Sequence, residues 1–112
     1  MESLAERRCV PCHGGVPRLT GAEIAPLAAQ LRGWRVEDEH HLAKEYKFAN
    51  FADALDFVNR VGRVSEAEGH HPDLNFGWGY ARIKIYTHAI DGLSESDFIL
   101  AAKIDKAVDS RQ

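Results

Sequence analysis

The sequence has little of several features that would mark a common class of protein. Its 112 residues contain two cysteines and one methionine, and the 14 basic residues do not outnumber the 17 acidic ones. A formal net charge of −3 provides no basic surface for nucleic acid or an anionic membrane. No apolar run approaches the roughly 18 residues of a membrane span. Residues 1–8 are charged and lack the apolar segment of a secretory signal, so we expect a cytoplasmic protein.

The two cysteines lie in the segment Cys9-Val10-Pro11-Cys12-His13. This spacing matches the attachment motif of c-type haem, but attachment requires export. A zinc site would need a second pair of ligands, and a redox pair would normally stand where a strand meets a helix. The segment is therefore interpreted either as an incidental loop or as a haem, metal or redox site, and we assign it no function.

The rest of the composition is ordinary, with 45% hydrophobic and 28% charged residues, and it predicts one globular domain. Glycines and prolines between positions 11 and 17 break any helix there. We therefore expect residues 1–19 to be an extended lead-in and residues 20–109 to form a single domain.

Three helices are predicted from caps and apolar spacing. Thr20 and Glu23 form a capping-box pattern for a first helix that ends at Gly33. Asn50 begins the longest helix, which ends at Gly69. Its apolar stripe is Phe51, Leu55, Val58, Val61 and Val64. A last amphipathic helix follows Gly92, capped by Ser94 or Ser96.

Two hairpins are predicted from alternating residues at 34–37 with 42–48 and at 74–78 with 81–86. The order is then α-β-β-α-β-β-α, which predicts an α+β domain with a four-stranded antiparallel sheet and helices packed on one face. A two-residue turn at Gly79-Tyr80 would place Trp78 opposite Ala81 and His71 opposite His88.

That register gathers Glu66, His70, His71 and His88 at one place. Imidazole is well matched to exchange protons near neutral pH, so the cluster favours acid–base catalysis. A three-ligand zinc site and a purely structural role are the alternatives, although adjacent residues of an extended segment point to opposite sides. A second pair, His40-His41, lies at a strand junction and is interpreted as solvated and structural.

The sequence resembles the pterin-4a-carbinolamine dehydratase family over roughly residues 19–104. The family signature is an acidic residue, three spacers, His-His-Pro, an aromatic residue, a histidine and an aspartate. The corresponding residues here are Glu66, His70-His71-Pro72, Trp78, His88 and Asp97. Gly69 is a departure, because many members have Asp or Asn there.

The resemblance implies dehydration of 4a-hydroxytetrahydropterin to quinonoid dihydropterin, the step that recycles the pterin of aromatic amino acid hydroxylases. It implies no metal or organic cofactor, and a homodimer that joins two sheets or a homotetramer. The implied catalytic residues are His70, His71, His88 and Glu66. The implied pterin-binding residues are His71, Trp34, Trp78, Thr87 and Asp97. A non-enzymatic dimerisation or assembly role on the same scaffold is the alternative.

Overall fold

The first helix begins at its predicted cap but ends early. In the computed structural model, which describes residues 3–9 and 17–109, α1 spans Gly21–Ala28. The backbone N–H of Thr20 donates to Glu23 Oε1 at 2.9 Å, as the capping box requires. The predicted end at Gly33 is wrong. After Ala29 the N–H groups of Gln30 and Leu31 donate to carbonyls three residues back, so the chain leaves the α-helix through tighter turns.

The second helix, α2, spans Phe51–Glu68 and confirms the prediction at both ends. Asn50 accepts a hydrogen bond from the Asp53 N–H at 2.8 Å, and Gly69 ends the helix in the left-handed region at φ 65°. The predicted apolar stripe is only partly buried, since Phe51 and Leu55 are exposed. The face turned to the core is instead Ala54, Phe57, Val61 and Ser65.

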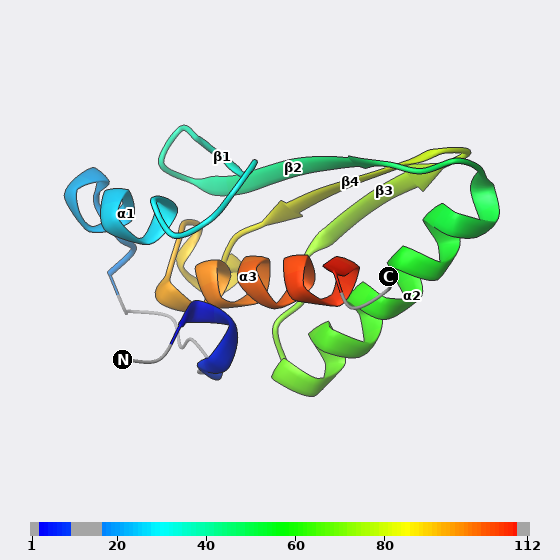
Figure 1. The fold of residues 1–112 in the computed structure, drawn as a ribbon. Coiled ribbons are helices and arrows are strands. Elements are labelled where there is room, and N and C mark those ends of the chain that lie inside the picture. The colour runs from blue at the N-terminus through cyan, green and yellow to red at the C-terminus, as the bar shows by residue number, and fades with distance from the viewer. Residues whose placement is uncertain (1–2, 10–16, 110–112) are drawn as a thin grey trace.

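Four antiparallel strands form one sheet in the order β1-β2-β4-β3. They are β1 Arg35–Glu37, β2 His41–Lys47, β3 Asp73–Gly77 and β4 Tyr80–Ile85. Figure 1 shows α1, α2 and α3 on the same side of this sheet, with its other face bare. The predicted α+β architecture and element order are confirmed.

The register of the second hairpin differs from the prediction by two residues. Phe76 pairs with Ala81 and Gly77 with Tyr80, so the turn is Trp78-Gly79. Gly79 takes φ 82° as the second central residue of the turn, which favours glycine there. A shift of two residues leaves every side chain on its predicted face, but His71 is no longer opposite His88.

The core lies between the sheet and the last helix, α3, which spans Glu95–Asp109. A short 3-10 helix, η1 (Leu4–Glu6), packs on α3 and buries Leu4. The largest fully buried apolar side chains come from the sheet, α2, α3 and the loop before α3: Phe57, Phe98, Leu42, Ile83, Ile85, Leu93, Ile99, Leu100, Ile104 and Val61. Among residues 3–9 and 17–109, no helix is long and apolar enough to cross a bilayer.

Candidate active site

A pocket forms where the end of α2, the start of β3 and the end of β4 meet. Its volume is about 340 Å³, within the range of small-molecule sites. The chain enters it through Gly69 and leaves β4 through the 3-10 helix η2 (His88–Ile90). The lining residues are Gly69, His70, His71, Pro72, Asp73, Tyr86, Thr87, His88 and Ala89. Three of the clustered imidazoles thus reach one pocket, although the predicted register is wrong.

His70 is held by a buried carboxylate. Its Nε2 lies 2.6 Å from Oδ1 of Asp97, which is fully buried in the first turn of α3. The other oxygen of Asp97 accepts hydrogen bonds from the Ser94 N–H and the Thr87 hydroxyl, both at 2.8 Å. Because Asp97 accepts throughout, we assign the Nε2 proton to His70. Its Nδ1 is then the nitrogen left to exchange a proton with a ligand.

His71 pairs with the carboxylate that the sequence singled out. Its Nε2 lies 2.5 Å from Oε2 of Glu66, in the last turn of α2. Both side chains are largely exposed, so this pair faces water whereas the His70–Asp97 pair is nearly enclosed. The two adjacent histidines therefore have separate carboxylate partners.

His88 has the loosest polar contact of the three. Its Nε2 lies 3.9 Å from Asp73 Oδ2, which is too long for a hydrogen bond. Its ring instead packs against Tyr86, with centroids 4.1 Å apart and planes tilted by 39°. Tyr86 and Asp73 were not predicted as site residues. The adjacency of Tyr86 to the Thr87-His88 pair was a signal for it, whereas Asp73 depended on the true hairpin register.

The two tryptophans that the resemblance implies for pterin binding lie away from this pocket. Trp78 is in the β3–β4 turn, where 71% of its surface is exposed. The indole N–H of Trp34 donates to Asp105 Oδ2 at 2.9 Å. Their predicted role in binding therefore stays a prediction, and neither lines the histidine pocket.

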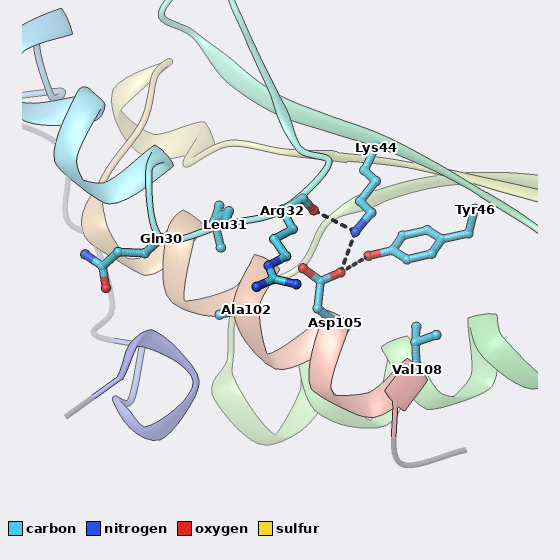
Figure 2. A pocket seen from close by; sticks show the side chains of 8 residues that line it. All are labelled: Gln30, Leu31, Arg32, Lys44, Tyr46, Ala102, Asp105 and Val108. Carbon is cyan, nitrogen blue, oxygen red and sulfur yellow. Dashed lines mark hydrogen bonds and ion pairs between the residues drawn. The ribbon is translucent and has the colours of Figure 1, made fainter. Parts of the chain in front are cut away.

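Asp105 belongs to a second pocket, of about 480 Å³, between α3 and β2 (Figure 2). Lys44 Nζ lies 2.9 Å from both Asp105 Oδ1 and the Arg32 carbonyl, and the Tyr46 hydroxyl also donates to Asp105. These charges satisfy one another. The pocket is larger than the first, but Lys44, Tyr46 and Asp105 already have partners within it, so the histidine pocket is the candidate active site.

Among residues 3–9 and 17–109, no group of three or more His, Cys, Asp or Glu is arranged to hold a metal ion. Of the Cys-x-x-Cys segment, Cys9 is within the described residues and Cys12 is outside them. The Cys9 backbone N–H donates to Glu68 Oε1 at 2.9 Å, which holds the pKa of Glu68 below its ordinary value.

Comparison with known proteins identifies the family of this chain. The family model for pterin 4 alpha carbinolamine dehydratase matches residues 17–107. A protein of Rubrobacter xylanophilus provisionally named as this dehydratase is 60% identical, over 95% of this chain and 99% of its own. One from Alkaliphilus metalliredigens, named in the same way, is 50% identical over 95% and 96%.

Two solved structures share the fold. A transcriptional coactivator/pterin dehydratase of Brucella melitensis matches 80% of this chain and 97% of its own with a TM-score of 0.75 and 26% identity. A pterin dehydratase-like protein identified as a RuBisCO assembly factor matches 68% and 89% with a TM-score of 0.59 and 28% identity. By sequence over nearly its whole length, and by a shared fold, the chain belongs to the pterin 4 alpha carbinolamine dehydratase family.

Proposed function

We propose that the protein dehydrates 4a-hydroxytetrahydropterin to quinonoid dihydropterin and water by histidine acid–base catalysis. The observation that carries the proposal is the convergence of His70, His71 and His88 on one small pocket. The family relationship supports the substrate class. Such a reaction would recycle the pterin cofactor of aromatic amino acid hydroxylases in the cytoplasm.

The chemistry needs one group to take a proton and one to give a proton. A base removes the proton from N5 of the pterin, and the electron pair forms the N5–C4a double bond as the C4a–O bond breaks. An acid protonates the departing hydroxyl, which leaves as water. His70, through Nδ1, and His88 are the proposed acid–base pair. His71, with its ring oriented by Glu66, binds and orients the pterin.

The first experiment measures the rate at which freshly generated 4a-hydroxytetrahydropterin loses water, with and without the protein. We expect a marked acceleration that a chelator does not remove, because no step uses a metal. His70→Ala and His88→Ala should each reduce the acceleration by about 10²-fold or more, as for loss of a general acid or base. Full activity in either folded variant would refute the assigned roles, and elemental analysis tests the zinc alternative.

The proposal includes assembly into a homodimer or homotetramer. Strand β3 forms one edge of the sheet. Large apolar side chains remain exposed on it, on the turn that follows it and on α2: Leu74, Trp78, Phe51 and Leu55. Exposed apolar edges of this kind favour pairing with another chain.

A non-enzymatic assembly role is the second candidate, and the structural similarity to the RuBisCO assembly factor favours it. The two candidates predict different results in the dehydration assay. A folded, correctly assembled protein that gives no acceleration would support the assembly role. The presence of all three histidines at the pocket supports the enzyme.

A further inference from the structure

We propose that His40 is a positioning residue that holds the ring of His88 in place through Tyr86. The inference rests on the function proposed above and adds a residue from the β1–β2 turn to its machinery. His40 lies outside the histidine pocket. It acts on the reaction only through the groups that it contacts.

The need for such a residue follows from the unequal support of the three histidines. Asp97 and Glu66 bind His70 and His71 at hydrogen-bond distance, but Asp73 lies 3.9 Å from His88 Nε2. The outer torsion of a histidine side chain has a broad energy profile, so an exposed ring without a strong hydrogen bond turns easily. The orientation of the His88 ring therefore depends on its contact with Tyr86.

His40 supports that contact from the neighbouring turn. Its ring packs on Tyr86 with centroids 4.6 Å apart and a tilt of 40°, and Tyr86 packs on His88 at 4.1 Å. Aromatic pairs in this range attract beyond simple burial. Rings from two segments, the β1–β2 turn and the residues that follow β4, thus form a continuous row that ends at His88.

A second connection fixes His40 itself. Its Nε2 lies 2.7 Å from Asp91 Oδ1, and the Asp91 N–H donates to the carbonyl of His88, closing the η2 turn. The hydrogen bond to His40 also lowers the pKa of the Asp91 carboxyl. His40 is thereby tied to the turn that carries His88.

The backbone on both sides of this hydrogen bond is held in an uncommon conformation. Asp38 and Glu39, directly before His40, have φ of 56° and 53°, and Asp91 has φ of 48°. Such residues persist where their surroundings hold them, and they concentrate at functional sites. The His40–Asp91 contact lies where these two strained segments meet.

The test compares three variants by kinetics and by the ring resonances of His88, assigned with His88→Gln. His40→Ala should lower kcat by about tenfold with little change in KM, because misplacing a reacting group impairs the chemical step more than binding. In the unmodified protein, the ring of Tyr86 should shift the His88 ring protons upfield. In His40→Ala their chemical shifts should move toward those of a solvent-exposed histidine. His40→Phe keeps a ring against Tyr86, so most of kcat and of the His88 chemical shifts should be retained.

Arg35→Ala is the control, because Arg35 lies on the neighbouring strand β1 and its largely exposed side chain pairs with Glu37. It should leave kcat and the His88 resonances close to those of the unmodified protein. If His40→Ala does not fold, His40→Gln takes its place. An unchanged kcat or unchanged His88 resonances in folded His40→Ala, or in the His40→Gln that replaces it, would overturn the proposal. If the unmodified protein is inactive, the proposed function fails, while the resonances still decide whether His40 positions His88.

Discussion

At the scale of single residues, Asp97 has two tasks, since it caps the start of α3 and orients His70. Asp97→Asn replaces one acceptor oxygen by a donor, so the side chain cannot serve Ser94, Thr87 and His70 together. We expect kcat to fall by about 10²-fold or more, because the amide favours the wrong tautomer of His70. Stability should fall by about 1–3 kcal/mol.

Asp105→Asn is the matched control, because Asp105 is also a carboxylate of α3 with several donors and lies at the other pocket. Steady-state kinetics and urea unfolding of both variants make the comparison. Similar kinetic losses in the two would show that Asp97 acts through stability alone.

Cys9 provides a second prediction at this scale. Burial raises the pKa of its thiol to about 12, and the nearby charge of Glu68 contributes to the same shift. The reactive thiolate is therefore scarce at neutral pH. Iodoacetamide should leave Cys9 unmodified in the folded protein and label it in urea, as read by peptide mass mapping. Rapid labelling of Cys9 in the folded state would contradict this.

At the scale of elements, a glycine inside α2 and the glycine that caps its end have opposite roles. Gly62 lies inside the helix with space around it, so Gly62→Ala should stabilise the protein by about 1 kcal/mol. Gly69 ends the helix at φ 65°, and Gly69→Ala should destabilise by about 1 kcal/mol for conformational reasons, since no atom lies within 4 Å of the added carbon. Thermal unfolding of the two variants provides the test. Changes of Tm with the same sign would contradict the prediction.

The elements also show what the sequence can specify. Caps at Thr20, Asn50 and Gly69 are local chemistry, and each marks a helix end in the structure. The hairpin register depends on whether Trp78 or Tyr80 joins Gly79 in the turn. The alternation of apolar residues does not distinguish the two registers, because they differ by two residues. Only packing decides between those registers, and it places Trp78 in solvent.

The candidate site was predictable to a similar degree. His70, His71 and His88 were identified from spacing and resemblance, and they share a pocket. Tyr86 was missed although it directly precedes Thr87-His88, and His40 was missed because its contact with Tyr86 joins segments far apart in the sequence. No local pattern encodes a contact between the β1–β2 turn and the end of β4.

At the scale of the whole molecule, stability should decrease on acidification. Burial and the charge of Lys84 lower the pKa of His41, and the Cys9 N–H lowers that of Glu68. Both groups bind fewer protons when folded than when unfolded, so unfolding is favoured as pH falls. Losses should begin below the ordinary value of 6.5 for His41 and deepen below 4.5 for Glu68.

Urea unfolding at a series of pH values measures this dependence. His41→Gln should reduce the loss below pH 6.5, and Glu68→Gln should reduce the loss below pH 4.5. A free energy of unfolding that stays level or rises as the pH is lowered would be inconsistent with these shifts.

Self-association is the other prediction at this scale. Leu74 lies opposite the buried Ile83 but remains partly exposed because β3 is an edge strand, so Leu74→Lys places a charge at this edge and should shift sedimentation toward smaller species. Arg82→Lys serves as the control, because it keeps a cation on the neighbouring strand β4. An unchanged mass of the sedimenting species in Leu74→Lys would show that the interface lies elsewhere.

The two tasks of Asp97 have a consequence for how relatives of this protein are recognised. A descendant that loses its chemistry and keeps its fold would be free to replace His70 or His88, while the start of α3 would still require the aspartate. Asp97 would then persist as an inherited feature in proteins with no catalytic role. A genome survey that counts this aspartate as a mark of activity would overestimate the number of enzymes, and the histidines are the better criterion.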